Sequence, residues 1–348
     1  MEVRPVVAWI LCALLGALVA VNLWRLVQSN FFCDGQPYLY VTFHDNPFNI
    51  YKYSRNGCLL STDVLSGAPK YNYGNHMVEL RSLAKGVYNG SSVLFVADAF
   101  TNDSFLNIYS HCNIRGQRTF IRSALSTFTH EGVNHIYGIA FDQDENVYVS
   151  SQHTDNVMRF TKDSFEPMPS PPYMTRSSSL YYTNYPGTFK QYGQPNTHSL
   201  NEQGVRDIAY ANNQIWIANE DLRAISVIDS ITGIVEDMVT GLQIPIGLYY
   251  HSYSQTMFVS SKSETNNTSN HGNIYGISIH TKQITHKMYT KTLIHPTGMA
   301  IYYDTLYVAE QSQSQIFSFS LRTGKLLNII VETENALPGM EKIMLSDC

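Results

Sequence analysis

Short apolar runs alternate with turn residues between His295 and Val331. Val, Ile, Tyr and Phe fill the runs, and Asp, Gly and Ser fill the gaps, which is the pattern of β-strands joined by tight turns. We expect a small sheet here, with strands at Gly298–Tyr303, Thr305–Ala309, Gln315–Ser320 and Lys325–Val331. Such a sheet has two open edges and is too small to be stable alone, so it should have counterparts elsewhere in the chain.

The same pattern recurs along the chain. Its second strands resemble one another: LFVA from Leu94, VYVS from Val147, IWIA from Ile215, MFVS from Met257 and LYVA from Leu306. A first strand precedes each of the last four, with anchor residues at Gly138, Asp207, Gly247 and Gly298. The base spacing of about 40 residues is that of one blade in a β-propeller. Longer gaps indicate insertions.

The two ends of the chain set the number of blades. Tyr38–Phe43 and Asn49–Ser54 look like second and third strands without a first one. The last segment, LPGMEKIMLSDC from Leu337, looks like HPTGMAIYY from His295, with Gly339 in the place of Gly298, so it is a first strand with nothing after it. Together they complete one blade, which closes the ring and removes its free edge. We therefore predict an all-β fold, a six-bladed β-propeller over residues 37–348 closed by its C-terminal strand. The other blades lie near 77–125, 135–193, 204–240, 244–290 and 295–331.

Two motifs carry a family resemblance. GIAFD-x-x-x-NVYVSS, from Gly138, and GMAIYYD-x-LYVAE, from Gly298, resemble the repeats of NHL-type six-bladed propellers. They are also similar to the wider group that contains paraoxonases, gluconolactonases and strictosidine-synthase-like proteins. The resemblance covers residues 36–348 and implies the fold, but propellers host many activities, so it implies no single function.

An apolar run precedes the propeller. Residues 6–24 form a stretch of 19 residues, long enough to cross a membrane as a helix. A short tail, 1–5, comes before it and a linker, 25–36, follows. The run fits a retained signal anchor or a signal peptide cleaved after Ser29, with a buried core helix as a third reading.

The first two readings place the propeller outside the cytosol. It would be a single-pass membrane protein, held by residues 6–24 with its propeller in a lumen or at the cell surface, or a secreted protein. Arg4 and Arg25 flank the run on opposite sides, so positive charges do not decide its orientation. Glycosylation sequons in predicted loops agree with this compartment, at Asn89, Asn102, Asn266 and Asn267.

Five cysteines bear on the same question. Cys12 lies in the apolar run and should stay unpaired. Cys348 follows the first strand of the closing blade, and Cys33 precedes its second strand. In the blade near 295–331 the corresponding positions meet at the tight turn around Asp304, which predicts a Cys33–Cys348 disulfide. The same alignment puts two cysteines at matching turns of adjacent blades, which predicts Cys58–Cys112. The alternative is that all four remain free, buried thiols.

Residues 162–203 are an insertion rich in Pro, Ser and Tyr. Thr188–Gly193 should supply the fourth strand of its blade, and the rest is a long loop. Long loops in compact domains are often functional. The insertion is therefore either a Tyr-rich lid or partner surface, or a packed or disordered excursion without a function of its own.

Polar residues follow the second strands, where they approach the central channel. The candidate channel-lining residues are Asp98, Gln152, Asn219, Glu220 and Glu310. Asp98, Asn219 and Glu310 occupy the same place in three blades, so their oxygens could hold Ca²⁺, which prefers several oxygen ligands. The alternative is a polar, water-filled channel without a metal.

The family resemblance bears on this calcium site. In gluconolactonases and paraoxonases, several calcium ligands directly precede the glycine near the start of a blade's first strand. The corresponding residues here are Tyr137, Arg206, Ile246 and Thr297. None is Asp, Asn or Glu, and Arg206 is a cation. The usual metal site of those enzymes is absent, which counts against an ordinary calcium-dependent lactonase.

Histidines near strand ends are the remaining candidates for catalysis. His44, His153 and His295 could act as general bases, as could His135, but no HExxH motif occurs. Charged residues make up only 15% of the chain and the net charge is −5, so no basic surface suggests a nucleic-acid partner.

Two functions remain open from the sequence. The first is an extracytoplasmic recognition domain that binds a protein, a glycan or a small molecule through the channel face and the 162–203 loop. The alternative is an esterase- or lactonase-like hydrolase with a metal in the central channel.

Overall fold

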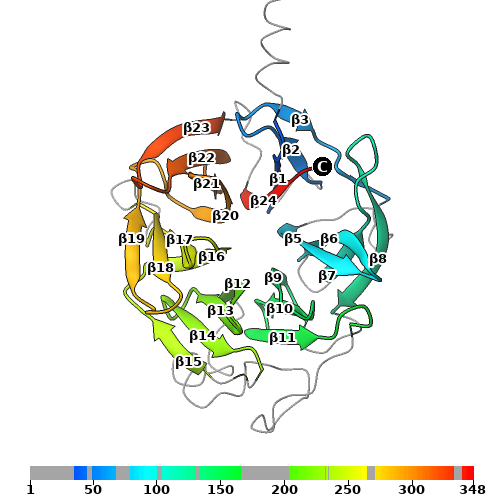
Figure 1. Cartoon of the computed structure of the whole chain (residues 1–348), viewed down its shortest axis with the longest axis horizontal. Helices are drawn as coiled ribbons and strands as arrows, with labels where there is room; N and C mark the ends of the chain where they lie inside the picture. The colour runs from blue at the N-terminus through cyan, green and yellow to red at the C-terminus, as the bar shows by residue number, and fades with distance from the viewer. Residues whose placement is uncertain are drawn as a thin grey trace, which may run out of the picture.

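The computed structural model describes residues 35–44, 49–67, 79–99, 104–127, 129, 133–165, 204–231, 233, 235–264, 271–332 and 339–348. Its sheets are arranged as six blades around a central axis, as Figure 1 shows, so the predicted six-bladed β-propeller is confirmed. Each blade is given below from the axis outward.

Blade 1 contains β24 (Met340–Ser346), β1 (Tyr38–Phe43), β2 (Tyr51–Tyr53) and β3 (Leu59–Ser61). Blade 2 contains β5 (Leu80–Tyr88), β6 (Ser91–Asp98), β7 (Phe105–Tyr109) and β8 (Arg118–Ser126), with β4 (Leu65–Ser66) outside them. Blade 3 contains β9 (Ile136–Phe141), β10 (Val147–Ser151) and β11 (Asn156–Phe160). Blade 4 contains β12 (Val205–Ala211), β13 (Gln214–Asn219), β14 (Ala224–Asp229) and β15 (Val235–Val239). Blade 5 contains β16 (Ile244–His251), β17 (Thr256–Lys262), β18 (Asn273–Ser278) and β19 (Ile284–Met288). Blade 6 contains β20 (Pro296–Tyr302), β21 (Thr305–Glu310), β22 (Gln315–Ser320) and β23 (Leu326–Glu332).

The two ends of the described chain meet in blade 1. Strand β24 pairs antiparallel with β1, with Leu345 opposite Leu39. Strand β4 was not predicted. It pairs in parallel with β8, with Leu65 opposite Arg118, so the chain leaving blade 1 covers the outer edge of blade 2. Covering that edge removes backbone groups that another chain could pair with.

The second strands are buried on both faces, which explains their unbroken apolar runs. In β13, Trp216 and Ala218 pack toward blade 5, whereas Ile215 and Ile217 pack toward Tyr148 of blade 3. Successive side chains of a strand point to opposite faces. Because a blade has a neighbour on each side, both faces must be apolar.

The innermost strands of neighbouring blades approach each other backbone to backbone. A Cβ atom at Gly247 would lie 2.3 Å from the carbonyl oxygen of Thr297, and one at Gly298 would lie 2.5 Å from the Cα of Lys342. Any side chain at these positions would push the blades apart. This contact is the physical reason for the recurring glycines.

Serines of the second strands tie the same contacts together. The hydroxyl of Ser260 accepts a hydrogen bond from the backbone N–H of Gly247 at 2.9 Å and donates to the carbonyl of Thr297 in blade 6 at 2.5 Å. Ser150 makes the equivalent two bonds between blades 3 and 4. These bonds fix the inner strands that carry the central site.

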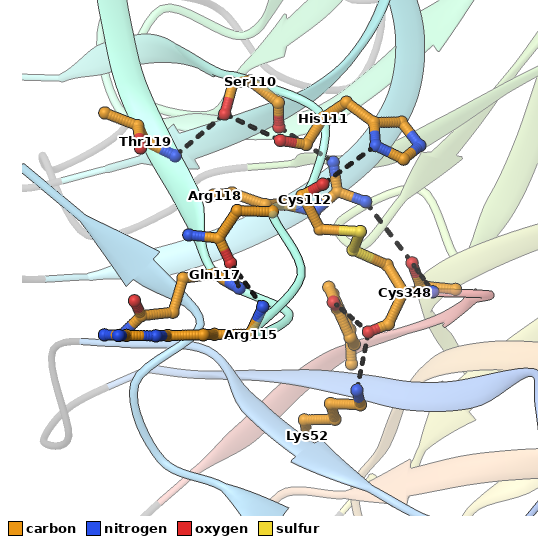
Figure 2. The surroundings of a disulfide bond; sticks show 12 residues. Lys52, Ser110, His111, Cys112, Arg115, Gln117, Arg118, Thr119 and Cys348 are labelled. Carbon is orange, nitrogen blue, oxygen red and sulfur yellow. Dashed lines mark hydrogen bonds between the residues drawn. A yellow bond between two sulfur atoms is a disulfide. The ribbon is translucent and has the colours of Figure 1, made fainter.

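A disulfide joins Cys112, in the loop between β7 and β8, to Cys348, which follows β24 (Figure 2). Both predicted pairings, Cys33–Cys348 and Cys58–Cys112, are therefore wrong. Cys58 is also disulfide-bonded, to neither Cys112 nor Cys348. The prediction compared positions within matching blades, whereas the end of β24 faces the outer loop of the next blade.

Polar contacts surround the disulfide and hold the end of β24 between two blades. The Lys52 ammonium of blade 1 donates to the carbonyl of Cys348 at 2.6 Å, and the Arg118 guanidinium of blade 2 donates to the Ser346 hydroxyl at 3.4 Å. Figure 2 shows Lys52 and Arg118 on opposite sides of the Cys348 backbone. The closing strand is therefore held by blade 2 as well as by its own blade.

Several predictions lie outside the described residues: the apolar run 6–24, Cys33, the strand Thr188–Gly193, and the sequons at Asn102, Asn266 and Asn267. Within the described part of the chain, no helix is long and apolar enough to span a membrane. Asn89 is exposed at the turn between β5 and β6, where Asn89 and Gly90 both have positive φ, at 48° and 72°. This Asn-Gly turn is typical of a tight hairpin, and glycosylation at Asn89 stays a prediction.

Candidate functional site

One residue of each inner strand directly precedes the position of close backbone contact. These six residues are Arg81, Tyr137, Arg206, Ile246, Thr297 and Glu341. Most of them contact one another at one end of the central channel, and we call the six the inner ring.

The sequence pattern identified four residues of the inner ring and missed Arg81 and Glu341. It matched Gly339 with Gly298, but the structure puts Lys342 in the place that corresponds to Gly298, three residues further on. In blade 2, Ser82 follows Arg81 where blades 3, 5 and 6 carry glycine. The missing signal was the pairing register of the inner strands, which the small-residue pattern alone does not supply.

Glu341 is the centre of one charge cluster. Its carboxylate is buried, lies 3.5 Å from the Arg81 guanidinium, and accepts hydrogen bonds from the Tyr137 hydroxyl and the Gln311 amide. Arg81 also pairs with Glu79 at 3.3 Å. Buried charges need such partners. Burial and the Glu341 carboxylate raise the pKa of Tyr137 well above its usual value, so this hydroxyl remains a donor.

Arg206 is the centre of the second cluster. Its guanidinium pairs with the Glu220 carboxylate, which also pairs with Lys262. Burial alone would raise the pKa of Glu220, but Arg206 and Lys262 outweigh it and hold that pKa below its usual value. The guanidinium carbon of Arg206 also lies 5.1 Å from the centre of the Tyr137 ring, which links the two clusters.

An ion pair crosses the channel beside the inner ring. Lys342 on β24 pairs with Asp207 on β12, and these strands belong to blades 1 and 4, which lie opposite each other in Figure 1. Asp207 also accepts a hydrogen bond from the backbone N–H of Leu248 at 3.0 Å. Asp207 stands where blades 3, 5 and 6 carry glycine, and its side chain forms this crossing pair. The channel is bridged here rather than open.

Histidines surround the two clusters. The rings of His135 and His153 stack with centroids 4.3 Å apart. Burial, and then Arg81, lower the pKa of His135 to about 2, and burial followed by Arg81 and Arg206 lowers the pKa of His153. Burial lowers the pKa of His295 to about 4. These imidazoles are neutral at neutral pH, and His135 and His295 are too weakly basic to be good general bases.

Two adjoining cavities form what we call the channel mouth. The first, of about 290 Å³, is lined by His44, Arg81, His135, Tyr137, Gln152, Arg206, His295 and Gln311, which come from five blades. The second, of about 370 Å³, shares His295 and includes Lys262, Ser263 and Glu264 of blade 5. Among the described residues that line the first cavity, none is Ser, Thr or Cys, so none supplies an obvious acyl-transfer nucleophile.

The predicted metal ligands have other roles in this structure. Asp98, Asn219 and Glu310 end their second strands, are buried, and accept backbone hydrogen bonds within their own blades at 3.2, 3.1 and 2.6 Å. Among the described residues, no group of three or more His, Cys, Asp or Glu side chains is arranged to hold a metal ion. The calcium prediction finds no support in this geometry.

The other candidates lie at the channel mouth. Gln152, His44 and His295 line the first cavity, His153 stacks on a lining residue, and Glu220 fixes Arg206. The arrangement offers fixed charges and hydrogen-bond donors, which suit the binding of a polar ligand.

Comparisons with known proteins support the fold. No family model matches the sequence, and no curated protein matches it. A chain in the crystal structure of a nidogen/laminin complex is similar, with a TM-score of 0.56 and 10% identity over 89% of this chain and 99% of that chain. A protein of unknown function from Bacteroides caccae also has a TM-score of 0.56, with 8% identity over the same shares. Likeness at this identity shows a shared β-propeller fold alone.

Proposed function

We propose that this protein is an extracytoplasmic recognition domain that binds a protein partner at its channel mouth. The observation that carries the proposal is the first cavity. Residues from five blades line it, and its two arginines are each held by carboxylates. Because these groups are held in place before a ligand arrives, little conformational entropy is lost on binding.

The sequence and the disulfide support an oxidising compartment. Disulfides persist mainly in secreted, lumenal and cell-surface proteins. The Cys112–Cys348 bond therefore agrees with the apolar run 6–24 and with the sequon at the exposed Asn89. We propose that residues 6–24 anchor the chain in a membrane or direct its secretion, with the propeller outside the cytosol.

The fold comparison agrees with a protein partner. One similar propeller comes from a complex of nidogen with laminin. The identity is too low to transfer that partner, so the likeness supports protein binding only in general terms.

Site-specific photo-crosslinking on the full chain tests the proposal. A photoreactive amino acid replaces Glu264, which lines the second cavity with its side chain 44% exposed, or Tyr253, which is 94% exposed. These residues lie beyond opposite ends of β17, so they sample opposite faces of the propeller. Both substitutions remove little buried contact, so both variants should fold.

We expect a specific protein to be crosslinked from position 264 and not from position 253 in cells that express the chain. Mass spectrometry identifies the adduct. Capture of the same proteins from both positions, capture from position 253 alone, or no protein adduct at all would rule out recognition at the channel mouth.

A further inference from the structure

The first cavity presents donors and cations but no acid. Its lining contains two guanidinium groups, three imidazoles, two amides and a phenol, and no Asp or Glu side chain. The carboxylates that hold the arginines, on Glu79, Glu220 and Glu341, are not among its lining residues. Glu341 is buried, and the side chains of Glu79 and Glu220 are 16% and 14% exposed.

Both guanidinium groups are held in place. Arg81 bonds Glu341 and Glu79, and Arg206 bonds Glu220. Both also lie over the Tyr137 ring, with guanidinium carbons 5.6 and 5.1 Å from its centre. A ligand that meets them does not have to order two long, flexible side chains.

Three buried polar atoms of the lining have no hydrogen-bond partner within the described part of the protein. They are Gln152 Oε1, His135 Nδ1 and Arg81 Nε, on residues that are 4%, 5% and 7% exposed. Folded proteins rarely leave such atoms unpaired, because an unpaired buried group loses its bonds to water without replacement. The terminal amide of Gln152 can also rotate to present its NH₂ group. A polar ligand in this cavity would supply partners.

The charged side chains around the first cavity indicate which charge a ligand should carry. Arg81, Arg206 and Lys262 are opposed by the carboxylates of Glu79, Glu220 and Glu341, so the clusters are near neutrality. The two arginines still leave a positive bias in the cavity, because their charges, second to burial, lower the pKa of His153. One added negative charge suits this bias better than two.

We propose that the first cavity binds one carboxylate, at the end of an Asp or Glu side chain that the protein partner inserts, with Arg81 and Arg206 as its charged donors. This inference rests on the proposed recognition function. The volume of about 290 Å³ is at the low end for ligand pockets, so it accommodates a side-chain end rather than a whole large ligand.

Two probes test the charge requirement on the full chain by isothermal titration calorimetry. N-acetyl-glutamate N-methylamide carries the carboxylate, and N-acetyl-glutamine N-methylamide is nearly the same size without the charge. We expect the glutamate probe to bind with a millimolar Kd and at least about tenfold more tightly than the glutamine probe, because charge-assisted hydrogen bonds are the stronger ones. Equal binding of the two probes, or no binding of the glutamate probe up to roughly 50 mM, would overturn the proposal.

A matched pair of variants locates the site. Arg206→Gln removes a lining arginine whose side chain is 17% exposed and pairs with Glu220. Arg159→Gln removes an arginine that is 16% exposed and pairs with Asp142, away from the channel mouth. Arg206→Gln should raise the Kd of the glutamate probe at least about tenfold, and Arg159→Gln should leave that Kd unchanged. Equal losses in both would refute the site. If Arg206→Gln fails to fold, the two probes on the unaltered chain still decide the question.

Failure of this inference can be told apart from failure of the proposed function. If a partner crosslinks from position 264 but the glutamate probe does not bind, protein recognition at the channel mouth is supported and the carboxylate-binding proposal is refuted. A glutamate probe that binds while no protein crosslinks would leave the carboxylate site standing and remove the protein partner.

Discussion

Replacing Gly298 by Ala should destabilise the ring at its point of closure. Gly298 lies on β20, where blade 6 meets the closing strand β24. A Cβ at this position would lie 2.5 Å from the Cα of Lys342, 2.6 Å from the backbone nitrogen of Ile343 and 2.7 Å from the carbonyl oxygen of Glu341. All three are backbone atoms, so no side-chain rotation can relieve the contact.

The magnitude follows from the distances. Carbon atoms in ordinary contact are about 3.5–4.0 Å apart, so β20 and β24 would have to separate by roughly 1 Å. Overpacking of a tight core costs about 1–3 kcal/mol. We expect a loss of about 3 kcal/mol in the free energy of unfolding, at the upper end of that range, because β24 is held on its other side by β1 and by the disulfide at Cys348.

Gly276→Ala is the matched control. Its Cβ would meet the Nδ1 and Cβ atoms of His286 at 3.0 and 3.1 Å and the Cγ2 atom of Thr256 at 3.3 Å. These contacts are longer than those at Gly298, and His286 lies on β19, the outermost strand of blade 5, which can shift by a few tenths of an ångström. Alanine also restricts the unfolded chain more than glycine does, which offsets part of any cost. We expect a change of less than about 1 kcal/mol for this variant.

Urea unfolding of both variants and the unaltered chain, followed by tryptophan fluorescence and circular dichroism, measures the difference. Two probes are needed to show that unfolding is two-state, which a domain of this size does not guarantee. A Gly298→Ala variant as stable as Gly276→Ala would refute the reasoning, because it would mean that the inner strands separate at little cost.

Three further predictions concern the disulfide, the histidines and a strand-end carboxylate. Replacing Cys112 and Cys348 by Ser should lower the free energy of unfolding by roughly 2–5 kcal/mol, because the bond closes a long loop. The two cysteines are 236 positions apart. A non-reducing thermal melt of the variant with the same midpoint as the unaltered chain would contradict this. Acid should destabilise the fold through His135 and His295, whose folded pKa values of about 2 and 4 lie below the unfolded value of 6.5. As the pH falls, the unfolded chain takes up protons before the folded one. The contribution of these histidines to the free energy of unfolding is therefore complete above about pH 6.5 and falls by up to about 3 kcal/mol per group by pH 4. Urea titrations at pH 7 and 5 measure this loss, and His295→Gln should reduce it. Glu310→Ala should cost about 2–4 kcal/mol, because two backbone N–H groups lose their acceptor, whereas Glu310→Gln keeps an acceptor and should cost less; equal melts for the two variants would count against this role.

The blade count and most strands could be predicted because a blade is a local structure. Its strands follow one another through short turns, so the period of the fold is also a period of the sequence. The predicted strands Tyr38–Phe43 and Gln315–Ser320 match β1 and β22 at both ends. The pairing of the two chain ends followed from the same logic, because one end lacked the strand that the other supplied.

The candidate site could be predicted only in part. The polar residues at the ends of the second strands were found, but their roles were not. Glu310 binds backbone N–H groups of its own blade, and a local pattern cannot distinguish that use from metal binding. The low pKa of His295 comes from burial at the meeting point of two cavities, which the sequence does not display.

The sequence by itself determined the repeated strands and the ring, since each blade is built mainly from residues near one another in the chain. It also determined the closure, because one end of the chain lacked the strand that the other end supplied. Only the tertiary structure decided which blades touch through which residues. Cys112 meets Cys348, and Lys342 meets Asp207 across the channel, because strand register and the curvature of the ring bring distant segments together. A short slip in register changes the face or the level at which a side chain lies. The sequence pattern misplaced the closing strand by three residues at Gly339, and so it missed Glu341, on which one charge cluster of the site depends.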